Sequence, residues 1–277
     1  MFIFSDVDGT IYDYQLRLPQ STVEAIRTLR KNGHFVYMVT GRSKAENPPE
    51  LWDIGFDGII GGNGAYVEDH GEVLLHKTIA REQCQKIFDW CEKRDIVFYE
   101  ECNEGLFASP HFIERAKYPL QRYFCGKGAV MEDLQDLDVR KVLHGLTEGK
   151  ELLRDGINKI SFIMNSEKDY EDSCRDFPDL NVGTWGGKDS EKIFGDFGIK
   201  GLDKAKAIEV LLKHHDAGFE DAIALGDGIQ DVGMLKKCRI GITFASACEE
   251  AKEVADYISD DVSNEGFAKA FRHYGLI

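Results

Sequence analysis

The stretch FIFSDVDGT, residues Phe2–Thr10, decides which fold to expect of this chain. Its apolar residues are typical of a short buried strand, and the strand ends in polar residues. Side chains two positions apart on an extended strand point to the same side, so Asp6 and Asp8 should present their carboxylates together. The stretch therefore predicts a buried strand with an acidic pair at its carboxyl end.

A helix and a second strand are predicted to follow this first strand. The helix should begin after Pro19, where Ser21 and Glu24 have the spacing of a capping box. The apolar run at residues 35–39 then predicts the next strand. Strand, helix and strand in that order indicate a parallel sheet with crossover helices.

The same pattern returns toward the end of the chain. Buried strands are predicted at residues 222–225 and 240–244, after an amphipathic helix at 202–215. Two further helices are predicted at residues 248–257 and 267–274. Both ends of the chain therefore fit one parallel sheet.

The middle of the chain has short strands and frequent turns instead. The strand candidates there are residues 96–100, 106–108, 141–146, 159–164 and 180–184. We therefore expect an α/β protein with a doubly wound, Rossmann-like parallel-sheet core. Residues 1–81 and 190–277 should form this core, and residues 82–189 an inserted α+β domain.

Composition and charge exclude several classes of protein. The 277 residues include 34 basic and 49 acidic side chains, a net charge of −15, whereas nucleic-acid and anionic-membrane binding need a basic surface. No apolar run approaches the roughly 20 residues of a membrane span, and the first residues lack the basic region of a signal peptide. The seven cysteines form no CxxC pair, so we expect reduced thiols and a cytoplasmic protein.

Polar residues follow the predicted strands of the core. In an open parallel sheet, ligands bind beyond the carboxyl ends of the strands. The candidates there are Asp6, Asp8, Thr40, Asn63, Asp227 and Asp231, with Lys204 at the start of the late helix. Together they offer a cation site, a nucleophile and an anchor for an anion.

Each candidate has a role in phosphate chemistry and an ordinary structural alternative. Paired carboxylates with Asp227 suit Mg²⁺, and Gly9 allows backbone amides to approach an anion closely. Thr40 fits a phosphoryl oxygen or a helix N-cap, and Lys204 fits a phosphoryl group or an exposed first helical turn. The aspartates could also occupy simple surface turns. EF-hand, P-loop and GxSxG motifs are absent from the sequence.

Four segments together resemble the motifs of the haloacid dehalogenase superfamily of phosphatases. They are DVDGTI at residues 6–11, TGR at 40–42, GLDKAKAI at 201–208 and GDGIQD at 226–231. The insertion between the second and third segments, preceded by GGNGAYV, is similar to the cap of the Cof-type, class IIB branch. The resemblance covers nearly the whole chain.

The resemblance implies a role for each matching residue. Asp6 would be the nucleophile and Asp8 the general acid and base, while Thr40 and Lys204 would bind the phosphoryl oxygens. Gly9, Gly41, Arg42 and Asn63 would complete the phosphate site. The Mg²⁺ ligands would be Asp6, the Asp8 main-chain carbonyl and Asp227, supported by Gln230 and Asp231. Gln230 departs from the asparagine usual in this branch, which puts its supporting hydrogen bond in doubt.

The expected function is therefore that of a phosphomonoester hydrolase. It would use Mg²⁺ and an aspartyl-phosphate intermediate to hydrolyse small phosphorylated metabolites, with sugar phosphates implied by the resemblance. A sugar phosphomutase of the same fold and a non-catalytic regulator that binds a metabolite are the alternatives. We expect a monomer or a weak homodimer, with no nucleic-acid or membrane partner.

Overall fold

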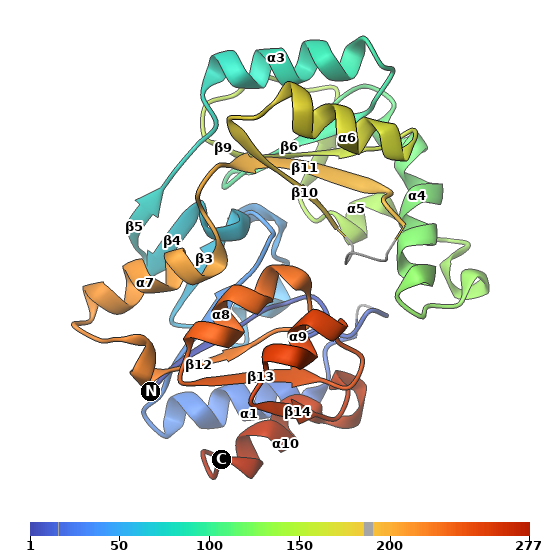
Figure 1. The fold of residues 1–277 in the computed structure, drawn as a ribbon. Coiled ribbons are helices and arrows are strands. Elements are labelled where there is room, and N and C mark those ends of the chain that lie inside the picture. The colour runs from blue at the N-terminus through green and yellow to red at the C-terminus, as the bar shows by residue number, and fades with distance from the viewer. Residues whose placement is uncertain (16, 186–190) are drawn as a thin grey trace. The chain divides into compact units, whose positions relative to one another are not determined.

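The computed structural model describes residues 1–15, 17–185 and 191–277 and divides into two units (Figure 1). The core unit consists of Met1–Gly41, Pro49–His76 and Leu202–Ile277. The cap unit consists of Arg42–Pro48 and Lys77–Gly201.

An eight-stranded sheet forms the centre of the core unit. Its strand order is β14-β13-β12-β1-β2-β3-β4-β5, with β14 to β3 parallel and β4 and β5 antiparallel. The chain builds outward from β1 in one direction and later from β12 in the other, so β1 and β12 flank the topological switch point. The strands are β1 (Phe2–Ser5), β2 (Phe35–Val39), β3 (Gly58–Gly61), β4 (Tyr66–Asp69), β5 (Glu72–His76), β12 (Ala222–Leu225), β13 (Ile240–Phe244) and β14 (Tyr257–Ser259).

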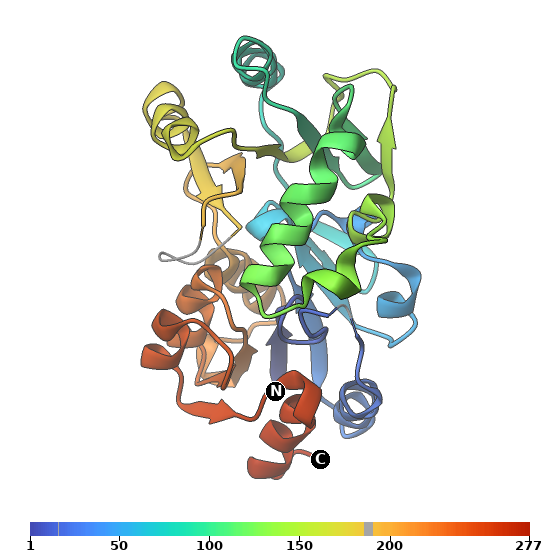
Figure 2. The same ribbon diagram turned by 90° about the vertical axis from the view of Figure 1, so that its right-hand side faces the viewer.

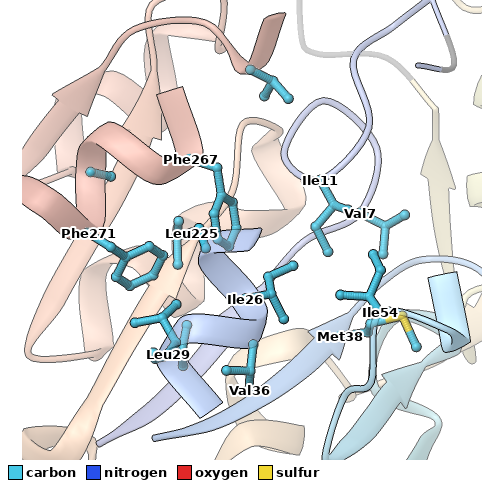
Figure 3. Packing of buried hydrophobic residues seen from close by; sticks show 14 of the residues in the cluster. Val7, Ile11, Ile26, Leu29, Val36, Met38, Ile54, Leu225, Phe267 and Phe271 are labelled. Carbon is cyan, nitrogen blue, oxygen red and sulfur yellow. The ribbon is translucent and has the colours of Figure 1, made fainter. Parts of the chain in front are cut away.

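Helices cover both faces of this sheet. On one face Ile26 and Leu29 of α1 pack near Phe267 and Phe271 of α10 in a buried hydrophobic cluster (Figure 3). A second cluster lies on the other face, beneath α7, α8 and α9. The helices are α1 (Gln20–Lys31), α2 (Pro49–Trp52), α7 (Lys204–His214), α8 (Val232–Lys237), α9 (Glu249–Val254) and α10 (Gly266–His273).

The cap unit contains a six-stranded sheet of order β10-β11-β9-β6-β7-β8. Helices α3 and α6 belong to one face of this sheet, and α4 and α5 to the other (Figure 2). The strands are β6 (Phe98–Cys102), β7 (Gly105–Ala108), β8 (Leu146–Glu148), β9 (Ile157–Ile163), β10 (Leu180–Thr184) and β11 (Phe194–Ile199). The helices are α3 (Arg81–Glu92), α4 (Phe112–Gly126), α5 (Val139–Val142) and α6 (Glu167–Asp176).

Single-turn 3₁₀ helices occur in both units. They are η1 (Lys44–Glu46), η2 (Gly62–Gly64), η3 (Met131–Leu134), η4 (Phe219–Asp221), η5 (Ile229–Asp231) and η6 (Val262–Asn264). Across the described ranges, no helix has both the length and the apolar character needed to cross a membrane.

The α/β fold class with an inserted α+β cap is confirmed. The limits of the two units differ from the predicted boundaries after residues 81 and 189. Strand β11 pairs with β9 and β10, so the cap unit continues to Gly201. Residues 42–48 also belong to the cap unit, where the Lys44 amide donates to Asn103 Oδ1 at 3.4 Å. The predicted boundary between residues 189 and 190 lies outside the described residues.

Three local predictions were wrong. Helix α1 begins behind Pro19 with no side-chain cap, so Ser21 and Glu24 form no capping box. The helix expected at residues 248–257 ends at Val254, because Asp256 instead exchanges hydrogen bonds with Gly241 and leads into strand β14. Residues 141–145 form the end of α5 and a turn, and only Leu146 of the predicted strand belongs to one, as the first residue of β8.

Candidate active site

Two parallel strands bring the first acidic residues together. In the register of β1 and β12, Ser5 lies opposite Leu225, and the Asp6 amide donates to the Leu225 carbonyl at 2.9 Å. The polar residues that follow both strands therefore meet at one edge of the sheet. One carboxylate oxygen from each of Asp6, Asp227 and Asp231 lies within 4.8 Å of the others, and all three residues are buried.

Lys204 completes this acidic cluster. It is the first residue of α7, whose preceding Asp203 accepts a hydrogen bond from the Lys206 amide at 2.7 Å. This N-cap hydrogen bond fixes the start of α7 and therefore the position of Lys204. Its Nζ lies 2.6 Å from both Asp6 Oδ1 and Asp231 Oδ1, and its side chain is 4% exposed. The ordinary alternative, an exposed lysine in a first helical turn, is therefore excluded.

Burial and neighbouring charges shift the pKa values of Asp6 and Lys204. Burial raises the pKa of Asp6 well above its usual value, Lys204 opposes this, and the neighbouring aspartates add to it. Burial alone would lower the pKa of Lys204, but attraction to Asp231 and Asp6 raises it above its usual value. One ammonium group thus faces three buried carboxylates, and the excess negative charge favours a further cation.

The loop after β1 encloses Asp227. Gly9 has a φ of +82°, and a Cβ atom there would lie 2.4 Å from Asp227 Oδ2, so only glycine fits. Thr10 Oγ1 is 3.4 Å from Asp227 Oδ1, and the Tyr14 hydroxyl donates to Oδ2 at 2.6 Å. The contacts of Thr10 and Tyr14 were not predicted. Thr10 belongs to the recognised motif, whereas no sequence signal pointed to Tyr14.

Asp231 stabilises the loop after β12 through hydrogen bonds to its backbone. Its Oδ2 accepts hydrogen bonds from the amides of Asp227 at 3.1 Å and Gly228 at 2.9 Å, while its Oδ1 contacts Lys204. Both of its oxygen atoms are therefore engaged within the loop and the helix start. This arrangement holds Asp227 and Lys204 in fixed positions around Asp6.

Two further predicted site residues, Thr40 and Asn63, follow strands β2 and β3. Thr40 is buried, and its carbonyl accepts from the Asn63 amide at 3.2 Å. Asn63 has a left-handed φ of 54°. A Cβ atom on Gly41 would lie 3.2 Å from Asn63 Oδ1 and 3.6 Å from Gln230 Oε1, so these side chains converge there. Asn63 Oδ1 is buried without a hydrogen-bond partner among the residues that the structure describes.

Asp8 and Arg42 are also predicted site residues. Asp8 is half-buried and forms a β-bridge with Tyr12 in the loop after β1. Arg42 begins the segment assigned to the cap unit. The catalytic role of Asp8 and the phosphate contact of Arg42 stay predictions.

The donor set fits a metal ion. Carboxylate oxygens are hard ligands, and three of them gather where one lysine leaves their charge only partly balanced. Within the described ranges, no other group of three acidic, histidine or cysteine residues gathers in this way. The edge of the sheet at β1 and β12 is therefore the candidate centre for metal-assisted chemistry.

The fold and the acidic site define a class of hydrolase, and comparison with known families agrees with it. The family model for haloacid dehalogenase-like hydrolases matches residues 3–271. The chain belongs to this family.

Several relatives that match nearly the whole chain are phosphatases by name. Putative phosphatase YkrA of Bacillus subtilis is 26% identical, over 99% of this chain and 98% of that protein. The 5-amino-6-(5-phospho-D-ribitylamino)uracil phosphatase YcsE of the same organism is 25% identical, over 98% and 94%. The solved structure of the subclass IIB sugar phosphatase BT4131 has a TM-score of 0.78 at 25% identity and covers 100% of this chain and 99% of that one. The predicted enzyme class, a Cof-type phosphatase of this superfamily, is confirmed.

Proposed function

We propose that this protein is a Mg²⁺-dependent phosphomonoesterase that acts on small phosphorylated metabolites through an aspartyl-phosphate on Asp6. The observation that carries the proposal is the buried cluster in which Lys204 bridges Asp6 and Asp231 beside Asp227. Covalent catalysis by a carboxylate divides a slow hydrolysis into two easier steps.

Asp6 and Asp8 share the bond-making and proton-transfer steps. The Asp6 carboxylate attacks phosphorus, and the bond from phosphorus to the ester oxygen breaks while Asp8 gives that oxygen its proton. Asp8 then takes a proton from water, which attacks the phosphorus of the aspartyl-phosphate. The bond to Asp6 breaks, and inorganic phosphate leaves.

The surrounding residues bind charge that develops on the phosphoryl group. Lys204 neutralises its oxygens from a buried position, where an ion pair is stronger than in water. Thr40 supplies a hydroxyl donor, and the remaining phosphate contacts are those predicted for Gly9, Gly41, Arg42 and Asn63. The ester would thus be held in line with Asp6.

The same cluster would hold Mg²⁺. The Asp6 and Asp227 carboxylates and the Asp8 main-chain carbonyl would be its protein ligands, and Asp231 and Gln230 would support them. Mg²⁺ keeps several waters and binds phosphate oxygens, so when bound it would screen the charge between nucleophile and substrate.

The substrates are proposed from the relatives. YcsE is named for a phosphoribityl compound, and BT4131 is described as a sugar phosphatase. Both names describe small organic phosphates, and we propose sugar phosphates as the substrate class. We also propose a cytoplasmic monomer or weak homodimer. All seven cysteines are free thiols, as expected of a reducing compartment.

Hydrolysis of p-nitrophenyl phosphate tests the proposal. We expect Mg²⁺-dependent release of phosphate that EDTA stops and that Asp6→Asn lowers by about 10⁴-fold or more. Acid-quenched enzyme should carry a phosphoryl group that hydroxylamine removes. Exposed Asp53 provides the control, and Asp53→Asn should keep full turnover. Full metal-dependent turnover of Asp6→Asn would contradict covalent catalysis at Asp6. In a separate incubation with a hexose phosphate, an isomerised sugar phosphate in place of free phosphate would indicate a phosphomutase.

A further inference from the structure

The two oxygen atoms of Asp227 have different surroundings. Oδ2 accepts a hydrogen bond from the Tyr14 hydroxyl at 2.6 Å, the length of a strong bond between a hydroxyl and a carboxylate. Oδ1 has a longer contact, 3.4 Å, with Thr10 Oγ1. Asp227 is 4% exposed, so these contacts form in a site with little competing water. Tyr14 therefore acts mainly on one of the two oxygens.

A hydrogen bond to one oxygen affects how a carboxylate binds a metal. The phenol proton engages Oδ2 and fixes the rotation of the carboxylate group, so that a metal ion would bind through the other oxygen. Binding through one oxygen suits the small octahedral Mg²⁺ ion. The larger Ca²⁺ ion has more ligands and often takes both oxygens of a carboxylate.

We propose that Tyr14 is a positioning residue that holds Asp227 for metal binding through one oxygen and so favours Mg²⁺ over Ca²⁺. The inference rests on the metal site of the proposed function. Tyr14 lies in the loop between β1 and α1, outside the four recognised motifs, and its role requires no contact with substrate.

Metal titration of the purified protein without substrate tests this role. Isothermal titration calorimetry with MgCl₂ and with CaCl₂ gives both affinities for wild type and Tyr14→Phe, which keeps the ring and removes only the hydroxyl. We expect Mg²⁺ affinity to fall by about 10–100-fold, the usual effect of losing a residue that orients a metal ligand. Ca²⁺ affinity should fall less, so that the Mg²⁺/Ca²⁺ affinity ratio falls at least about fivefold.

Tyr12 provides a matched control in the same loop. Its hydroxyl donates to Glu50 Oε1 at 3.3 Å. Tyr12→Phe should therefore lose a longer hydroxyl–carboxylate bond of the same type without changing either metal affinity by more than about twofold. Melting temperatures of both variants would show that each is folded.

The outcomes separate this inference from the proposed function. An unchanged affinity ratio, equal weakening of both cations or tighter Mg²⁺ binding by Tyr14→Phe would overturn the role of Tyr14 while leaving the phosphatase proposal standing. A wild-type protein that binds neither cation, with or without phosphate, would overturn the metal site itself and the inference with it.

Discussion

The core and the cap each bury a lysine among carboxylates, and the two clusters differ in how completely that lysine is paired. In the core, Lys204 Nζ lies 2.6 Å from one oxygen each of Asp6 and Asp231. In the cap, Lys159 is 6% exposed, and its Nζ lies 3.2 Å from Glu101 Oε2. Chemically similar groups are thus buried in both units.

The cap cluster lies across the middle of a sheet rather than at strand ends. Ser161 of β9 is the register partner of both Tyr99 of β6 and Asp196 of β11, and Glu101 is the partner of Lys159. Asp196 Oδ2 is buried and has no hydrogen-bond partner in the described part of the chain. Burial raises the pKa of Asp196, and Lys159 opposes this shift.

A buried lysine among acids is common to both units and so does not by itself identify the candidate active site. The core cluster is distinguished by Asp227, a third carboxylate within metal-binding distance of Asp6 and Asp231, and by its place at the switch point of a parallel sheet. The cap cluster has neither feature among the described residues. Substitution of each lysine can test this distinction.

Replacing Lys204 should have the largest effect of these substitutions. Lys204→Met removes the only cation that Asp6 and Asp231 contact within hydrogen-bond distance among the described residues, and with it a preorganised stabiliser of the transition state. We expect kcat for p-nitrophenyl phosphate at saturating Mg²⁺ to fall about 10³-fold. Lys206→Met, on the exposed side of the same helical turn, is the control. A loss under tenfold would remove Lys204 from the catalytic site.

Replacing Lys159 should instead affect stability. Lys159→Met leaves Glu101 and Asp196 as buried acids without their basic neighbour, and breaking such a pair costs about 3–5 kcal/mol. Urea denaturation would show this loss, and Lys159→Met with Glu101→Gln should recover part of it. The folded variant should keep kcat for p-nitrophenyl phosphate within about threefold. A loss of kcat comparable to that of Lys204→Met, without loss of stability, would make the two lysines equivalent.

The convergence of Asp6 and Asp227 could be predicted from the sequence more readily than the strands of the cap, for physical reasons. Asp6 and Asp227 follow short apolar runs, and the parallel sheet order brings the ends of such strands together. Strand β11 reads FGDFGI, in which two glycines and Asp196 interrupt the apolar pattern, so it was not recognised and the cap limits differed. The bond from Tyr14 to Asp227 depends on the path of a loop, and no local pattern encodes it.

The smallest expected effect concerns Glu100, which lies beside Glu101 on β6 and belongs to the opposite face of the cap sheet. The pKa of Glu100 is raised to about 7. Burial causes this rise, and hydrogen bonds from the backbone amides of Leu153 and Arg154 partly oppose it. Because this folded-state pKa lies above the usual unfolded value of about 4.3, folding favours the protonated form. The stability contributed by this proton is complete below about pH 4 and is lost as the pH rises through 7.

Glu100→Gln should therefore flatten the pH dependence of stability. The melting temperature of the wild type should fall between pH 5 and pH 8 by about 4–8 °C more than that of the variant, because this pKa difference is worth roughly 2–3 kcal/mol over that range. The exposed Glu104 provides the control, and Glu104→Gln should follow the wild-type slope. Equal slopes for Glu100→Gln and wild type would show that the carboxyl is charged in the folded protein throughout this range. The cap sheet would then hold a buried charge at Glu100 as well as at Lys159, and the difference between the two units would be smaller than their lysine contacts indicate.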